Sequence, residues 1–217
     1  MLMRSKLFVP AGRPELFPKA LAGAADALSF DLEDAVLDSR KDEARANLRA
    51  FLRSEAVWSS EKTIIVRINP LDSPHCAVDL DAVLGGRVDW INVPKAEHPE
   101  GVRRLAELLD HLERAHPPRR GARLLLTVET PRGLREAAAL AGAHPRVAGL
   151  QLGLGDLFAR VRDTRWRLIE EAHGTISRPF FAMLTHPALR GTASGTGART
   201  GRRRRAGRDR WFPDGRA

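Results

Sequence analysis

The chain has 217 residues, of which 43% are hydrophobic and 29% charged, a composition typical of a globular protein with one sizeable core. A single cysteine, Cys76, excludes an internal disulfide, and no window of about 18 residues is apolar and uncharged, so we expect a cytoplasmic protein without a membrane span. The net charge of +9 is concentrated after Thr185, where nine of the 36 basic residues but only two of the 27 acidic ones lie. Residues 1–185 are therefore nearly neutral, which disfavours nucleic acid as a partner of that part of the chain.

Six short apolar runs recur along the chain and predict strands. They span residues 6–9, 27–32, 63–68, 90–93, 123–128 and 147–152. Each run is continuously aliphatic or β-branched, which is typical of strands in a parallel sheet that is covered on both faces.

Helical patterns lie between these strands, over residues 15–25, 39–52 and 101–114, where apolar side chains recur at helical spacing. Alternating strands and helices predict a parallel α/β fold, either a barrel or a doubly wound sheet. Six strand-helix units precede residue 157, whereas a complete (β/α)8 barrel contains eight and needs about 250 residues.

The end of the chain has a different composition. From residue 190 onward it is rich in Arg, Gly, Thr and Ala, with four arginines in succession at 202–205. Such a segment lacks the apolar side chains of a core. We therefore expect a barrel-like domain over residues 1–185 and a basic, low-complexity, disordered tail over residues 186–217.

Charged side chains lie where five of the predicted strands end. They are Asp31, Glu33 and Asp34 at the second strand, Arg67 at the third, Lys95 at the fourth, Glu129 at the fifth and Asp156 at the sixth. Because active sites of parallel α/β folds lie at the carboxyl ends of the strands, we expect these side chains to converge at one edge.

Glu129 and Asp156 follow neighbouring strands, where an unpaired charge is costly unless a cation compensates it. Oxygen ligands without His or Cys suit Mg²⁺, with Mn²⁺ as the alternative. The same residues also have ordinary interpretations: Glu129 at the positive end of the following helix, and Asp156 or Asp34 as a helix N-cap.

Arg67 is the expected substrate-binding residue, because a planar guanidinium can grip a carboxylate or an enolate in two places. The alternative is a structural ion pair of Arg67 with Glu33 or Asp34.

Seven blocks of sequence, in order over residues 4–157, resemble the citrate lyase beta-chain and malyl-CoA lyase family within the HpcH/HpaI aldolase-citrate lyase superfamily. The blocks are residues 4–10 with 12–14, 31–36, 41 with 44–45, 66–69, 94–95, 128–130 and 153–157. The resemblance implies a (β/α)8 TIM-barrel fold, here incomplete with six recognisable units. After residue 157 the chain departs from the family pattern, so we expect it to be truncated or divergent there.

The resemblance also implies a Mg²⁺-dependent carbon-carbon lyase that cleaves or forms a hydroxyacyl-CoA, such as citryl-CoA or malyl-CoA, through an enolate. Glu129 and Asp156 are similar to the family's metal ligands. Arg67 and Glu129 are similar to its substrate-contacting pair, and Glu33 and Asp34 to the carboxylates that orient Arg67 and metal-bound water.

Arg13 and Lys19 resemble the basic residues that meet the CoA nucleotide, and their alternative is a solvated surface charge. The general base stays open between a carboxylate such as Asp34, metal-bound water and a residue of a partner subunit, because no His ends a strand. Two other functions stay open: a 2-oxo acid aldolase without CoA, and a catalytically silent barrel acting as a binding or assembly subunit. In each case we expect a homo-oligomer.

Overall fold

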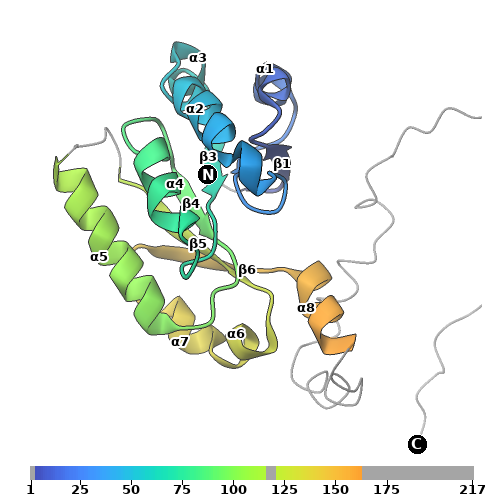
Figure 1. Ribbon diagram of the computed structural model, residues 1–217, viewed down its shortest axis with the longest axis vertical. Coiled ribbons are helices and arrows are strands. Elements are labelled where there is room, and N and C mark those ends of the chain that lie inside the picture. The colour runs from blue at the N-terminus through green and yellow to red at the C-terminus, as the bar shows by residue number, and fades with distance from the viewer. Residues whose placement is uncertain (1–2, 116–120, 163–217) are drawn as a thin grey trace, which may run out of the picture. The chain divides into compact units, whose positions relative to one another are not determined.

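A single parallel sheet organises the computed structural model, which describes residues 3–115 and 121–162. Its strands follow one another in the order β1-β2-β3-β4-β5-β6 (Figure 1). They are β1 (Lys6–Pro10), β2 (Ala27–Asp31), β3 (Thr63–Arg67), β4 (Trp90–Val93), β5 (Arg123–Val128) and β6 (Val147–Leu152). All six predicted strands are confirmed to within one residue at each end.

Every strand pairs in parallel with its neighbour in sequence. A doubly wound sheet would reverse the strand order at its switch point, so the sequential order selects the barrel type over that alternative. Within the described residues β1 and β6 are the two edges of the sheet, and the barrel is not closed. The predicted incomplete TIM-barrel-type fold is therefore confirmed.

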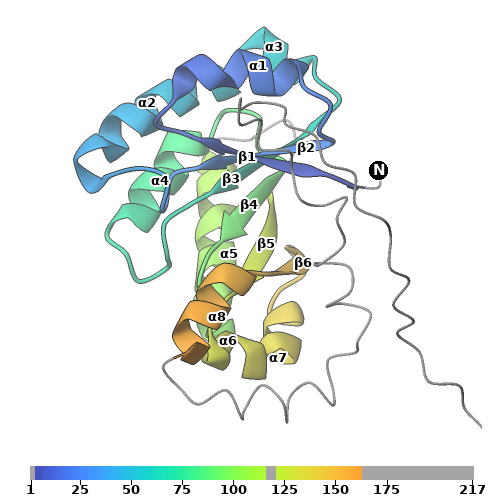
Figure 2. The same cartoon turned by 90° about the vertical axis from the view of Figure 1, so that its right-hand side faces the viewer.

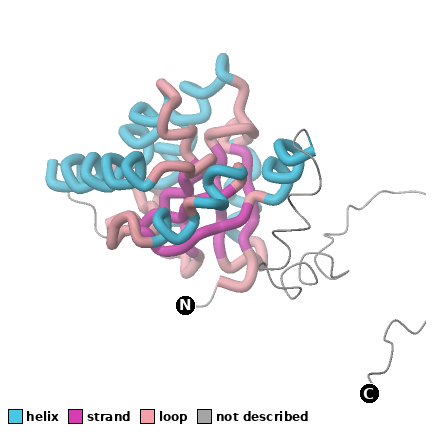
Figure 3. Tube along the Cα trace, turned by 90° about the horizontal axis from the view of Figure 1, so that it is seen from below, coloured by secondary structure: helices cyan, strands magenta, loops and turns pink. Residues whose placement is uncertain are grey.

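Helices lie along the sheet, most of them on one side of it (Figures 2 and 3). They are α1 (Phe17–Ala22), α2 (Lys41–Leu52), α3 (Glu55–Trp58), α4 (His75–Val83), α5 (Pro99–Ala115), α6 (Pro131–Arg135), α7 (Ala137–Ala141) and α8 (Leu154–Arg162), with 3-10 turns η1 (Pro14–Leu16) and η2 (Asp38–Arg40). The helix predicted over 15–25 is too long, because it starts as η1 and ends at Ala22, where Gly23 turns to extended backbone.

Alternate residues of the buried strands face the helices and form the core. Phe30 of β2 packs there against Phe17 and Phe51, with ring centroids 5.1 and 5.4 Å away. The opposite face of the sheet carries buried polar side chains instead, among them Asp31 and Thr127. This alternation places polar side chains on the inner face of the curved sheet. The apolar runs in the sequence did not predict that the inner face would be polar.

None of the helices in the described ranges is long and apolar enough to cross a membrane. The expected domain boundary at residue 185 and the tail over residues 186–217 lie outside the described residues.

Candidate functional site

Arg67 ends β3 directly opposite Asp31, the residue that ends β2. Its Nε and Nη2 donate to Asp31 Oδ1 and Oδ2 over 2.8 and 2.5 Å, a bidentate contact. Asp31 also accepts from the Glu33 amide at 2.9 Å, so it shapes the loop after its own strand. The sequence placed Asp31 at this edge, but its pairing with Arg67 depends on the strand register and was not predicted.

Glu33 lies between two cations. Its Oε2 is 3.0 Å from Arg67 Nη1, and its Oε1 accepts a hydrogen bond of 2.7 Å from Lys95 Nζ. Asp34 lies farther out, 3.6 Å from Arg67 and 3.7 Å from Lys95. The Glu33 side chain is 4% exposed and that of Asp34 is 55% exposed. The ion pair considered as an alternative for Arg67 is thus present, and Lys95 joins it.

Burial raises the pKa of Glu33 above its usual range, against the opposing effects of Lys95 and Arg67. For Arg67, burial lowers the pKa, but the hydrogen bonds to Asp31 and the charges of Asp31, Glu33 and Asp34 outweigh it and raise the pKa. Arg67 is therefore a permanent cation among carboxylates.

Glu129 follows β5 and is 3% exposed. Its Oε1 accepts a 2.7 Å hydrogen bond from the Lys95 backbone amide. Its Oε2 lies against Gly153 at the end of β6, where a Cβ would come within 2.5 Å of that oxygen. Glycine at position 153 is therefore required for the carboxylate to occupy this place.

Asp156 lies in the first turn of α8, not at its N-cap. Burial raises the pKa of Glu129, and the nearby negative charge of Asp156 raises it further, while the Lys95 amide opposes both. Two carboxylates that repel each other supply hard oxygen donors, and these fit Mg²⁺. The described residues contain no group of three or more His, Cys, Asp or Glu side chains placed to hold a metal. Two carboxylates fit Mg²⁺, which proteins commonly hold through one or two carboxylates together with water and substrate oxygens.

A second polar network supports the loop after β2 from behind. The buried Lys41 ammonium donates to the carbonyls of Leu32 and Glu33 at 2.9 and 3.1 Å and to Asn69 Oδ1 at 2.9 Å. Asn69 in turn donates to the fully buried Asp79 through its backbone nitrogen and its side-chain Nδ2, at 2.8 and 2.7 Å. Lys41 and Asn69 belong to the sequence blocks named above, but α4 and its Asp79 were not predicted.

The two predicted CoA-binding residues lie after β1. Arg13 precedes η1 and pairs with Glu15 at 2.9 Å, and Lys19 lies exposed on α1. Because they follow a parallel strand, they lie at the same edge of the sheet as Arg67.

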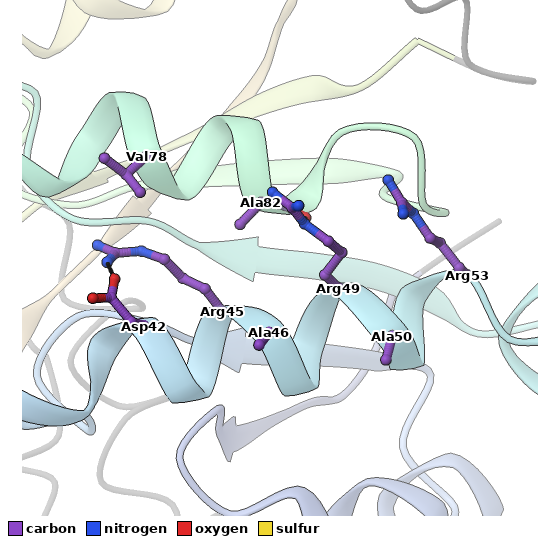
Figure 4. Close-up of a pocket in the computed structure, with 8 residues that line it drawn as sticks. All are labelled: Asp42, Arg45, Ala46, Arg49, Ala50, Arg53, Val78 and Ala82. Atoms are coloured by element: carbon purple, nitrogen blue, oxygen red, sulfur yellow. Dashed lines mark hydrogen bonds and ion pairs between the residues drawn. The ribbon is translucent and has the colours of Figure 1, made fainter.

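A groove of about 400 Å³ runs between α2 and α4 (Figure 4). Arg45 and Arg49 of α2 and Arg53 directly after it line the groove, opposite Val78 and Ala82 of α4. None of the predicted site residues lines this groove, so the strand-end cluster is a separate feature.

Comparison with known proteins identifies relatives in sequence. Residues 4–177 match the family model of HpcH/HpaI aldolase/citrate lyase. The citrate lyase subunit beta of Haemophilus influenzae is 33% identical over 165 residues, 76% of this chain and 56% of that protein. The L-malyl-CoA/beta-methylmalyl-CoA lyase of Cereibacter sphaeroides is 35% identical over 159 residues, 72% of this chain and 49% of that protein. The chain thus spans about half the length of these relatives.

Solved structures agree with the sequence comparison. The citrate lyase beta subunit of M. tuberculosis, complexed with oxaloacetate and magnesium, superposes with a TM-score of 0.59 at 32% identity, covering 79% of this chain and 70% of that one. CitE of Mycobacterium tuberculosis with magnesium, acetoacetate and coenzyme A gives 0.59 at 33% identity, covering 81% and 61%. The family model, the sequence relatives and the solved structures agree, and the chain belongs to the HpcH/HpaI aldolase/citrate lyase family.

Proposed function

We propose that the protein is a Mg²⁺-dependent carbon-carbon lyase that cleaves or forms a hydroxyacyl-CoA, such as citryl-CoA or malyl-CoA, through an enolate. Family membership and relatives named as lyases support the reaction class. The observation that carries the proposal is the buried carboxylate of Glu129, which accepts from the Lys95 amide at 2.7 Å and lies close enough to Asp156 and Arg67 for both charges to act on its pKa.

Glu129 and Asp156 are the proposed metal ligands. Glu129 commits Oε1 to the Lys95 amide, which leaves Oε2 for a cation. A bound Mg²⁺ supplies Lewis-acid polarisation of the substrate oxygens, and Mn²⁺ is the expected substitute. Solved relatives with magnesium bound support Mg²⁺ as the metal.

Arg67 and Glu129 are the proposed substrate contacts. Asp31 takes up Nε and Nη2 of Arg67, and Nη1 lies 3.0 Å from Glu33, so the substrate oxygens would share Nη1 with that carboxylate. A fixed positive charge stabilises the negative charge that develops on the substrate during cleavage.

Asp34 is the proposed proton-transfer group, since its carboxylate is exposed whereas Glu33 is buried and orients Arg67. In the cleavage direction the carboxylate accepts the proton of the substrate hydroxyl, and the O–H electron pair forms the new carbonyl. The electron pair of the broken carbon-carbon bond passes into the thioester as an enolate. The enolate then takes up the proton that Asp34 accepted, which restores the carboxylate, and the two products are the oxo acid and the acyl-CoA.

Arg13 and Lys19 are proposed to contact the CoA nucleotide, because both are exposed basic residues after β1. A solved relative that holds coenzyme A supports a CoA-binding site. A second copy of the chain is the proposed protein partner, since β1 and β6, the edge strands of the sheet within the described residues, expose Leu7 (43%), Phe8 (46%) and Leu150 (38%). Sedimentation velocity measures that association.

A 2-oxo acid aldolase without CoA is the second candidate. Solved relatives complexed with oxaloacetate or pyruvate, which are free oxo acids, support this second candidate.

The test is an assay of purified protein with malyl-CoA and citryl-CoA, in which release of the product acyl-CoA is followed with Mg²⁺ and with excess EDTA. We expect Mg²⁺-dependent cleavage of a thioester by the native chain and none by Glu129→Gln. Cleavage of a free hydroxy-oxo acid in place of the thioester would establish the second candidate. Turnover that persists in EDTA and in Glu129→Gln would refute the metal-dependent mechanism.

A further inference from the structure

Lys95 has an unusual backbone conformation for a long side chain. Its φ is +49°, and it is the one non-glycine residue with positive φ in the two described stretches. An L-residue pays a steric cost there, because Cβ approaches the following carbonyl. Such strain persists where the surrounding structure demands it.

That conformation lets one residue reach both acidic sides of the site. The Lys95 amide donates to Glu129 Oε1 at 2.7 Å, and its ammonium donates to Glu33 Oε1 at 2.7 Å. Asp34 lies 3.7 Å from the same ammonium. The backbone of Lys95 thus contacts Glu129, the proposed metal ligand, and its side chain contacts Glu33, which lies against Arg67.

The turn around Lys95 is held rigidly. The Ala96 amide donates to the Thr127 carbonyl of β5 at 3.1 Å. On its other side the Ala96 carbonyl packs against Gly133 in α6, where a Cβ would come within 2.4 Å of that oxygen. These two contacts fix the chain directly after Lys95, so the turn is supported by the fold and not by the Glu129 contact alone.

We propose that Lys95 is a positioning residue: its amide fixes Glu129 for metal binding, and its ammonium fixes Glu33 and through it Arg67. The inference rests on the lyase function proposed above. It assigns two separable roles to one residue, and each role has its own variant.

The backbone role is tested by comparing Lys95→Gly with Lys95→Ala. Both variants lack the ammonium, but only glycine adopts positive φ without strain. We expect the Mn²⁺ dissociation constant, measured by electron paramagnetic resonance, to be at least threefold higher in Lys95→Ala than in Lys95→Gly. Equal dissociation constants would overturn the backbone role.

The ammonium role is tested by turnover. We expect kcat of Lys95→Gly to fall at least tenfold with KM and Mn²⁺ affinity nearly unchanged, and Lys95→Arg to recover part of kcat because it restores the charge. A glycine variant that folds and turns over like the native chain would overturn this role, since a purely structural lysine in a strained turn is replaced by glycine without loss.

A third measurement does not depend on activity. Hydrogen exchange of the Lys95 amide should accelerate at least tenfold in Glu129→Ala, while the Ala96 amide, which donates to backbone, keeps its rate. If the native chain binds no Mn²⁺ and shows no turnover, the lyase proposal fails while this exchange result still decides the Glu129 contact. Unchanged exchange at Lys95 would overturn the positioning proposal whatever the activity.

Discussion

Arg67 contacts the carboxylates of Asp31 and Glu33 and lies near Asp34, so a single residue links the loop after β2 to the end of β3. Asp31 holds two nitrogens of its guanidinium, and the third nitrogen, Nη1, lies 3.0 Å from Glu33 and is the one that the proposed substrate would also contact. The same guanidinium therefore contributes to the stability of the fold and to the proposed substrate contact, and a substitution at Arg67 should change both stability and turnover.

Arg67→Lys should lower kcat/KM by about 30-fold, or about 2 kcal/mol of barrier, because an ammonium cannot hold Asp31 bidentately and still face the substrate. Loss of the second hydrogen bond to Asp31 should also lower the free energy of unfolding by about 1 kcal/mol. Steady-state kinetics and urea denaturation measure the two effects. Unaltered turnover of the folded variant would show that Arg67 is only a structural ion pair.

Glu129→Gln should abolish Mg²⁺ and Mn²⁺ binding measured by calorimetry, and Asp156→Asn should weaken it. The side-chain carbonyl introduced by Glu129→Gln can still accept from the Lys95 N–H, so the fold should be kept while the negative charge is lost. Because burial and Asp156 already disfavour a charged Glu129, each neutral variant should also be at least as stable as the native chain without metal. Binding that is the same in both variants and in the native chain would exclude the proposed ligand pair.

At the scale of elements, α2 and α4 are joined by a buried ion pair. Arg45 of α2 is nearly buried, and its Nε donates to Asp79 of α4 at 2.8 Å. Its Nη1 donates to Asp42 at 2.7 Å, a contact that Figure 4 shows. Its Nη2 is buried without a hydrogen-bond partner, so Arg45 depends on the two contacts that it makes. A buried charge without its partner is strongly destabilising.

Asp79→Ala should therefore lower the free energy of unfolding by about 3–5 kcal/mol, because it removes the buried partner of Arg45 Nε and of the Asn69 backbone amide. Asp81→Ala is the matched control on the same helix. Asp81 pairs with Arg49 at 2.7 Å, but its side chain is 78% exposed, so its loss should change stability little. Urea denaturation of both variants gives the comparison, and equal effects would contradict the network.

At the scale of the whole molecule, the two edges of the sheet approach each other through side chains. Lys6 of β1 donates to Gln151 of β6, and its ammonium lies 4.5 Å from the centroid of the Phe8 ring. Burial, and then the positive charge of Arg67, lower the pKa of Lys6 to about 8.

This shift has a definite sign for stability. Between about pH 8 and the ordinary lysine pKa the unfolded chain binds more protons at Lys6 than the folded one, so this residue makes the free energy of unfolding rise with pH in that window. In Lys6→Met that rise should be absent. Urea denaturation from pH 7 to 10 measures the difference between the native chain and the variant, and a difference that does not vary with pH would refute the shift.

The sequence by itself determined the six strands, their parallel connection and the edge at which the charged residues gather. These features depend on runs of apolar residues and on the rule that parallel strands end together, both of which are local in the chain. Glu33, Asp34, Arg67, Glu129 and Asp156 were found in this way, and their catalytic, substrate and metal roles stay predictions.

Only the tertiary structure decided which of these charges meet. The Asp31–Arg67 pair depends on the register between β2 and β3. The two contacts of Lys95 depend on its positive φ, which no residue pattern in the sequence predicts. The Asp79 network requires α4 to lie against α2. Each is a contact between segments distant in sequence, and its energy is set by geometry and burial that exist only after the chain has folded.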